Sequence, residues 1–190
     1  NFDIRLVFPM ISTVDEIKQA LQCLENVHLS LENENIPHRW PVETAMMIET
    51  PSAALLTSSF AKYMDYFSIG TNDLTQYTLA AERGNPELAD YADALHPAVL
   101  HLIRHVVDAA HQHGKHVGVC GEVAGDSVAV PILVGLGVDE LSLNPGGIPQ
   151  VKAIIRKLDM VSASTLAEDV LQTESATEAR RLAKNFVAGL

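Results

Sequence analysis

The sequence predicts an α/β fold, a (β/α)8 barrel of the TIM type, present as a partial barrel with about five parallel strands and C-terminal helices. Five short apolar segments alternate with helical patterns along the chain, and this alternation is typical of right-handed βαβ units around a parallel sheet. Polar residues follow most of these segments, at the end of the sheet where such barrels carry their active sites. Because neither G-x-G-x-x-G nor a Walker lysine motif occurs, a barrel is favoured over a nucleotide-binding sheet.

Composition indicates one domain with no affinity for nucleic acid. With 190 residues, 47% of them hydrophobic, the chain can form one sizeable core, which we assign to residues 1–190. A formal net charge of −11 argues against a nucleic-acid partner, which clustered Lys and Arg would bind. The sequence shows no signal peptide and no membrane span, and its two cysteines fit a cytoplasmic setting. Since Asn1 leads almost directly into an apolar strand, we expect the C-terminal part of a longer protein whose upstream strands are absent here.

The first two strands are predicted at residues 5–10 and 44–48. Residues 5–10 are largely apolar, as in a buried strand, and Thr13 with Glu16 forms a capping box for the next helix. Thr50 is placed to cap a helix after the second strand. The first helix carries an apolar stripe for burial: Val14, Ile17, Leu21, Leu24 and Leu31.

Three further strands are predicted at residues 66–69, 116–119 and 140–143. A helix over residues 97–113 precedes the fourth strand, and Asp126 is placed to cap the helix before the fifth. Pro131 marks either the first turn of that helix or a kink. Three helical segments complete the chain.

The last three helices have recognisable starts. The first begins near Pro149, and the other two follow apparent capping boxes formed by Thr165 with Glu168 and by Ser175 with Glu178.

Two carboxylates, Glu49 and Asp73, follow neighbouring strands and are candidate metal ligands. Carboxylate oxygens suit a hard cation, Mg²⁺ or Mn²⁺. The alternative is that Asp73 caps a helix and Glu49 is merely solvated. Because both residues lie at the same end of the predicted sheet, we favour the metal site. Asn72 and Arg83 fit as groups that bind oxygens of an anionic substrate, against an alternative of turn chemistry and a surface cation.

Cys120 follows the fourth strand and precedes Gly121 and Glu122. This position suits a thiol acid or nucleophile, and the neighbouring carboxylate favours a proton donor over a thiolate. An inert buried cysteine is the alternative reading. Other candidates are weaker. His101 and His105 are predicted on a solvated helix face, Cys23 is expected to be unreactive, and Arg5 is expected to have a structural role.

Five segments, taken in order, resemble the phosphoenolpyruvate-utilising enzymes, and most closely the enzyme I family of the bacterial sugar phosphotransferase system. They are residues 8–11 (FPMI), 47–54 (MIETPSAA), 68–83, 120–126 and 139–142. The resemblance implies a (β/α)8 barrel that binds phosphoenolpyruvate, with Glu49 and Asp73 as Mg²⁺ ligands. It also implies that Asn72, Asp73 and Arg83 bind substrate and that Cys120 is the general acid.

The reaction that the resemblance implies is a transfer of the phosphoryl group from phosphoenolpyruvate to an enzyme histidine. The group then passes to a histidine-containing phosphocarrier protein, and pyruvate is released. In the family the phosphorylated histidine lies in a separate N-terminal domain, and none of the eight histidines here matches it. The C-terminal helices correspond to the part that forms the homodimer. Two alternatives stay open: an enzyme of the pyruvate phosphate dikinase or phosphoenolpyruvate synthase type, and a non-catalytic regulatory or dimerisation module.

Overall fold

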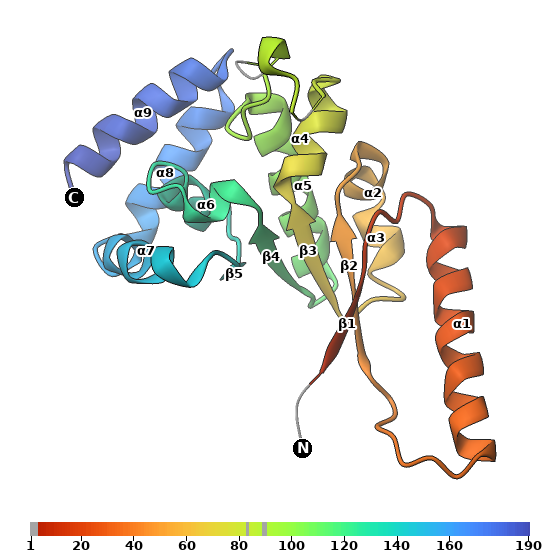
Figure 1. Ribbon diagram of the computed structural model, residues 1–190. Helices are drawn as coiled ribbons and strands as arrows, with labels where there is room; N and C mark the ends of the chain where they lie inside the picture. The colour runs from red at the N-terminus through yellow and green to blue at the C-terminus, as the bar shows by residue number, and fades with distance from the viewer. Residues whose placement is uncertain (1–3, 83, 89–90) are drawn as a thin grey trace.

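The five predicted strands form one parallel sheet whose spatial order follows the chain. The computed structural model describes residues 4–82, 84–88 and 91–190. Neighbouring strands pair in the order β1, β2, β3, β4, β5. Doubly wound sheets reverse direction within the sheet, whereas each strand of a (β/α)8 barrel lies beside the next. The described residues therefore form part of a barrel, as predicted (Figure 1). The strands are β1 (Arg5–Phe8), β2 (Glu43–Ile48), β3 (Tyr66–Gly70), β4 (His116–Cys120) and β5 (Glu140–Leu141).

Helices of very different lengths connect and follow the strands (Figure 1). The α-helices are α1 (Val14–Asn33), α2 (Pro51–Leu55), α3 (Thr57–Phe60), α4 (Thr71–Leu79), α5 (Pro97–Gln112), α6 (Val130–Gly135), α7 (Ile148–Ile155), α8 (Met160–Leu171) and α9 (Ala176–Ala188). Short 3₁₀ turns are η1 (Pro86–Leu88), η2 (Glu122–Gly125) and η3 (Pro145–Gly147). The helix α5 packs against β4, α2 and α3, while α6 packs against α8.

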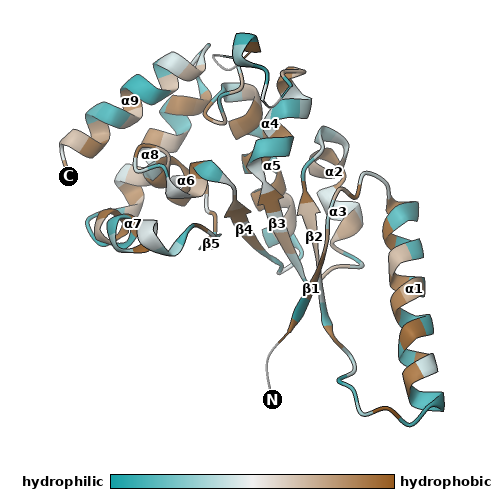
Figure 2. Ribbon diagram, viewed as in Figure 1, coloured by the Kyte–Doolittle hydropathy of each residue, from teal (hydrophilic) through white to brown (hydrophobic). Residues whose placement is uncertain are grey.

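Strand alternation separates a core face of the sheet from a face that carries small and polar residues. One face contributes apolar side chains to the core: Met46, Ile48, Phe67, Ile69, Val117 and Val119. Figure 2 shows these strands as predominantly hydrophobic. Because successive side chains point to opposite faces, Ser68, Gly70, Gly118 and Cys120 lie on the other face. The register confirms this, since Ser68 pairs with Gly118 and Gly70 with Cys120.

Several predicted helix starts are confirmed. Thr13 and Glu16 form the expected capping box at α1, and Thr50 accepts a hydrogen bond from the backbone of Ala53 at the start of α2. Ser175 likewise accepts from Glu178 N at α9. The question left open for Pro131 is settled in favour of the first turn of α6.

The prediction of a buried first strand was wrong. Arg5, Leu6 and Val7 are exposed and only Phe8 is partly buried. The strand also ends at Phe8, because Pro9 has no amide to donate and Met10 takes a positive φ of 55°. Within the described part of the chain, β1 pairs with β2 alone. An edge position therefore leaves its apolar side chains uncovered.

The apolar stripe of α1 is only partly buried. Ile17 is fully buried, and Val14 and Leu21 pack against the core from partly buried positions. Further along, Val27 and Leu29 are about half exposed, and Figure 1 shows α1 running beyond the sheet. Leu24 and Leu31 of the predicted stripe are also partly buried. Val27 and Leu29 lie outside the stripe, so the stripe correctly marks the more covered face of the helix.

Two predicted caps were wrong. Asp126 does not cap α6, whose N-cap is Ala129 without a side-chain bond; its carboxylate instead binds Val128 N and Arg180. Thr165 lies inside α8, which Asp159 caps by accepting from Ser162 N. Polar residues at the correct spacing had other partners.

The fifth strand is also shorter than predicted, because only Glu140 and Leu141 take part in its pairing with β4.

Within the residues that the structure describes, no helix is both long enough and apolar enough to cross a membrane.

Candidate functional site

The candidate site lies at the carboxyl ends of β2, β3 and β4. Ile48 pairs with Ile69, and Ile69 pairs with Val119, so the residues that follow these strands start from the same level. Glu49 follows Ile48, the helix α4 starts directly after Gly70, and Cys120 ends β4. The sequence did not reveal that Asn72 and Asp73 belong to the first turn of a helix. Parallel register therefore brings segments far apart in the chain to one edge.

Glu49 and Asp73 form a close pair of carboxylates. Glu49 is 6% exposed, and its Oε2 accepts a 2.7 Å hydrogen bond from the Met10 amide. Burial raises the pKa of Glu49, and the charge of Asp73 together with a hydrogen bond between the two side chains raises it further, while the Met10 amide opposes the rise. Two acidic groups in such proximity repel when both are ionised.

The donor set of this pair fits a divalent hard cation. Two carboxylate oxygens from rigid elements, one buried and one half-buried, match the oxygen ligands that Mg²⁺ takes in combination with water and substrate oxygens. A cation between them would also remove their mutual repulsion. The residues present therefore fit the metal that the sequence predicts, with Glu49 and Asp73 as its protein ligands.

Two glycines leave the space that these side chains occupy. A Cβ at Gly70 would lie 2.6 Å from Glu49 Cγ and 2.9 Å from Glu49 Oε1. Gly121 has a φ of +102°, and a Cβ there would lie 2.5 Å from Thr71 Oγ1 and 3.2 Å from Asn72 Oδ1. Any larger residue at either position would displace a residue of the site. Asn72 thus lies against the turn that follows Cys120.

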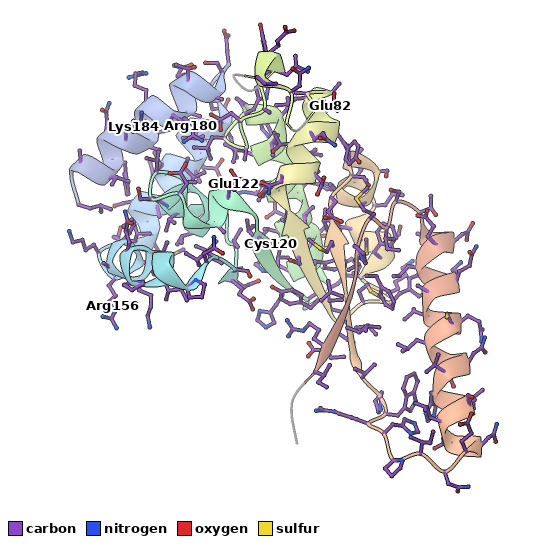
Figure 3. All side chains as sticks on the ribbon, viewed as in Figure 1. Glu82, Cys120, Glu122, Arg156, Arg180 and Lys184 are labelled. Carbon is purple, nitrogen blue, oxygen red and sulfur yellow. The ribbon has the colours of Figure 1, made fainter. Side chains whose placement is uncertain are left out.

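Cys120 carries its thiol on the face of the sheet that also holds Ser68 and Gly70. Its sulfur accepts a 3.5 Å hydrogen bond from Ser68 Oγ, and the thiol donates at 3.5 Å to the carbonyl of Ile69. Thr71 Oγ1 donates to the Cys120 carbonyl at 2.8 Å, which joins the start of α4 to the end of β4. Figure 3 shows Cys120 at the end of β4 with Glu122 just beyond it.

Two cavities open beside Asn72. One, of about 700 Å³, is lined by Cys120, Asn72, Glu122, Ser142 and Asn144 among others. The other, of about 870 Å³, shares Asn72 and Glu122 and extends towards Arg180. Asn72 therefore stands between a cavity that reaches the thiol and a cavity bounded by charged side chains. Both are large enough for a small phosphorylated metabolite.

Arg83, the third predicted substrate-binding residue, lies outside the described residues. The structure brings Glu49, Asp73, Asn72 and Cys120 together, and leaves the position of Arg83 as a prediction.

Sequence reasoning missed an ion-pair cluster in the wall of the larger cavity. Arg180 of α9 donates from its Nη2 to Asp93 Oδ1 at 2.9 Å and from its Nη1 to Asp126 Oδ2 at 2.7 Å. The hydrogen bond to Asp93 is the main cause that raises the pKa of Arg180, with Asp126 adding to it. The partners are 87 and 54 positions away in the chain. No local pattern links them.

The weaker candidates lie where the sequence placed them. His101 and His105 are exposed, and each bonds a different backbone carbonyl, of Leu171 and Leu55. Arg5 pairs with Glu43 at 2.9 Å and lies over the ring of Tyr66, away from the site. Cys23 is exposed on α1.

Two solved structures resemble the fold at low sequence identity. A citrate lyase from Burkholderia xenovorans aligns with a TM-score of 0.54 and 15% identity, covering 96% of this chain and 63% of that one. A citrate lyase β subunit from M. tuberculosis aligns with a TM-score of 0.51 and 16% identity, covering 80% and 61%. These matches support the barrel architecture and carry no information about activity.

Curated relatives are much more similar in sequence. The phosphoenolpyruvate-protein phosphotransferase of Mycoplasma capricolum is 42% identical over 185 residues, which cover 97% of this chain and 32% of the relative. The protein of the same name from Geobacillus stearothermophilus is 44% identical over 176 residues, covering 93% and 30%. The chain thus spans about a third of the length of the curated relatives it matches.

Residues 1–160 match the family described as the PEP-utilising enzyme, PEP-binding domain. This match includes all the candidate residues named above. The chain belongs to the PEP-binding domain family of the PEP-utilising enzymes.

Proposed function

We propose that this chain is the phosphoenolpyruvate-binding part of a phosphoenolpyruvate–protein phosphotransferase of the sugar phosphotransferase system. The parent protein moves the phosphoryl group of phosphoenolpyruvate to one of its own histidines and then to a histidine-containing phosphocarrier protein, and releases pyruvate. Relatives that bear this name support the proposal, since they match over 93–97% of the chain.

The observation that carries the proposal is the meeting of Glu49, Asp73, Asn72 and Cys120 at one edge of the sheet. Phosphoryl transfer needs positive charge around the phosphate, and the subsequent formation of pyruvate needs a proton on carbon. The carboxylate pair supplies ligands for a cation, and the thiol supplies a proton. Each requirement thus has a matching group within one site.

Glu49 and Asp73 hold Mg²⁺, with Mn²⁺ as a substitute, in the proposed complex. When bound, the metal ion supplies Lewis-acid stabilisation of charge on the phosphate and carboxylate oxygens of the substrate. Asn72 donates from its side-chain amide to a substrate oxygen. Gly70, the N-cap of α4, provides no side-chain hydrogen bond to the first turn, and the N-terminus of a helix favours an anion. Arg83 is proposed to pair with the phosphate.

Cys120 is proposed to act as the general acid. The enolate that remains after phosphoryl transfer takes the thiol proton at its methylene carbon, which yields the methyl group of pyruvate. In the structure that proton is donated to the Ile69 carbonyl, a neutral acceptor, while Ser68 donates to the sulfur.

The acceptor histidine is proposed to enter from another domain of the parent protein. No described histidine lines either cavity, so within the described residues the site has no nucleophile of that type. The parent is expected to be a cytoplasmic homodimer that forms through its C-terminal helices. Exposed apolar residues on α7 and α8 support a contact there, namely Ile155, Met160 and Val161.

The proposal is tested by incubating the parent protein with phosphoenolpyruvate labelled in its phosphate, Mg²⁺ and a purified histidine-containing carrier. We expect label on the carrier and stoichiometric pyruvate without added ATP. Transfer that requires ATP or pyrophosphate would instead identify an enzyme of the dikinase or synthase type. Binding of phosphoenolpyruvate without any turnover would identify a non-catalytic module.

A further inference from the structure

A second group of metal-ligating side chains lies at the end of α1, apart from the candidate site. His28, Glu32 and His38 are the one such group of three among the described residues whose donor atoms all lie within 4.8 Å of one another. The end of α1 and its connection to β2 lie at the opposite end of the molecule from the carboxyl ends of the strands (Figure 1). Neither the proposed metal pair nor Cys120 involves these residues.

Helix geometry and a chain reversal create the group. His28 and Glu32 are four residues apart on α1, so they lie on one face, one turn above the other. The chain then reverses at Asn35, which takes a positive φ of 53°, and Ile36 N closes the helix by donating to the Leu31 carbonyl at 2.9 Å. This reversal returns His38 to the same face.

The two imidazole rings face each other through nitrogen atoms. His28 Nδ1 lies 2.7 Å from His38 Nε2, and His38 Nδ1 lies 2.8 Å from the Ile36 carbonyl. A carbonyl only accepts, so His38 Nδ1 carries a proton, and its Nε2 presents a lone pair to His28 when the ring is neutral. The Ile36 bond is the type of support that orients a metal-bound histidine.

Aromatic stacking holds the other ring in place. Trp40 stacks on His28 with ring centroids 4.2 Å apart and an interplanar angle of 7°. Trp40 itself is 38% exposed, so its stacking partner is this histidine ring and not the main core. Among the described residues, the Glu32 carboxylate has no hydrogen-bond or ion-pair partner, and it remains available as a ligand.

We propose that His28, Glu32 and His38 bind a Zn²⁺ ion, with water as the fourth ligand. Two imidazoles and one carboxylate form a ligand set that suits this borderline cation and disfavours Mg²⁺, which selects oxygen. Tetrahedral Zn–N bonds of about 2.0–2.1 Å place the two nitrogens about 3.3 Å apart. The rings therefore separate by about 0.6 Å from their present contact. The Nδ1 proton of His28 moves to its Nε2, so that both facing nitrogens offer lone pairs.

A Zn²⁺ ion bound here would stabilise a part of the fold that has little contact with the core. The second half of α1 has no fully buried residue, and residues 34–40 are exposed. An ion held by ligands from both segments links the connection to the helix and stabilises the native chain by mass action. We therefore assign the site a structural role that is independent of the proposed phosphotransfer.

The proposal is tested by titrating the chain with Co²⁺, a spectroscopic substitute for Zn²⁺, in a millimolar excess of Mg²⁺ that occupies oxygen sites. We expect one equivalent to bind with the intense visible absorption of tetrahedral cobalt and without a sulfur-to-cobalt charge-transfer band. The absence of that band excludes Cys23 and Cys120 as ligands. Zn²⁺ should displace the cobalt and raise the thermal unfolding temperature.

The variants locate the site. His28→Ala and His38→Ala should each weaken Co²⁺ binding at least about tenfold, and His105→Ala, which removes an exposed histidine elsewhere, should leave it unchanged. Far-UV circular dichroism checks folding, and His38→Gln serves as the more conservative change. Unchanged affinity in the His28 and His38 variants, a sulfur band, or no cobalt binding by the unmodified chain would each overturn the proposal.

Discussion

Replacing Glu49 by glutamine is expected to stabilise the metal-free chain and to abolish its response to Mg²⁺. Burial and the neighbouring Asp73 raise the pKa of Glu49 above its ordinary value of 4.5. The native state therefore holds this proton more tightly than the unfolded state, and the free energy of unfolding falls as pH rises from 4.5 through the raised native pKa. Glutamine carries no charge, so it removes the part of this penalty that is present at neutral pH.

The magnitude follows from the arrangement of the pair. Two unit charges about 4 Å apart interact by about 4 kcal/mol at an effective dielectric constant near 20, and the half-buried position of Asp73 lowers this by solvent screening. The hydrogen bond from Met10 N can persist with a glutamine oxygen. We expect a gain of about 1–4 kcal/mol. For a chain of this size each kcal/mol raises the unfolding temperature by about 2–4 °C.

Glu49→Gln should also lose the stabilisation that Mg²⁺ gives to the unmodified chain. At a Mg²⁺ concentration ten times its dissociation constant, binding stabilises the unmodified chain by about 1.4 kcal/mol. Glu49→Gln loses a charged ligand and should show no such shift.

Thermal unfolding followed by circular dichroism, with EDTA or with Mg²⁺, measures both effects. Asp108→Asn is the matched control, because it removes an exposed carboxylate from α5. A Glu49→Gln chain that is less stable than the parent in EDTA, or equally stabilised by Mg²⁺, would refute the reasoning.

Three other changes test separate parts of the account. Cys120→Ala should lower pyruvate formation by the parent protein at least about 100-fold while Mg²⁺-dependent binding of phosphoenolpyruvate, measured by calorimetry, persists; unchanged turnover would remove the thiol from its proposed role. Gly70→Ala should cost about 1–3 kcal/mol in urea unfolding and weaken Mg²⁺ binding, because its Cβ would lie 2.6 Å from Glu49 Cγ; a neutral effect would show that Glu49 has room to move. Burial alone would raise the pKa of Asp139, but hydrogen bonds from His111 and Val117 N lower it below its ordinary value of 3.8. This carboxylate therefore stabilises the fold at pH values above 3.8 and loses that contribution as pH falls through the lowered native pKa. Asp139→Asn should therefore destabilise the chain by about 1–3 kcal/mol near pH 7, with a deficit that shrinks in acid; a deficit independent of pH would contradict this origin.

The parts of the fold that depend on local patterns could be predicted from the sequence. Thr13 with Glu16 and Thr50 begin helices because their side chains bond amides within the next three residues. The position of Glu49 and Asp73 after predicted strands also indicated the end of the sheet where they lie, since parallel strands share one carboxyl edge.

The features that depend on distant partners could not be predicted. Asp126 has the residue type and spacing of a cap, but Arg180 lies 54 positions away and binds it instead. The apolar pattern of β1 likewise gives no information about whether another element covers that strand. Glu49 could be named as a ligand from its position, whereas its hydrogen bond from the Met10 amide joins residues 39 positions apart, which no local pattern predicts.

The most direct test of the central claim is a crystal structure of the parent protein grown with Mn²⁺ and phosphoenolpyruvate, with anomalous scattering used to locate the metal. The account predicts one manganese peak within ligand distance of Glu49 and Asp73, with substrate oxygens completing its coordination and the Cys120 thiol facing the methylene carbon. A manganese ion bound elsewhere, or a substrate separated from both carboxylates, would contradict it.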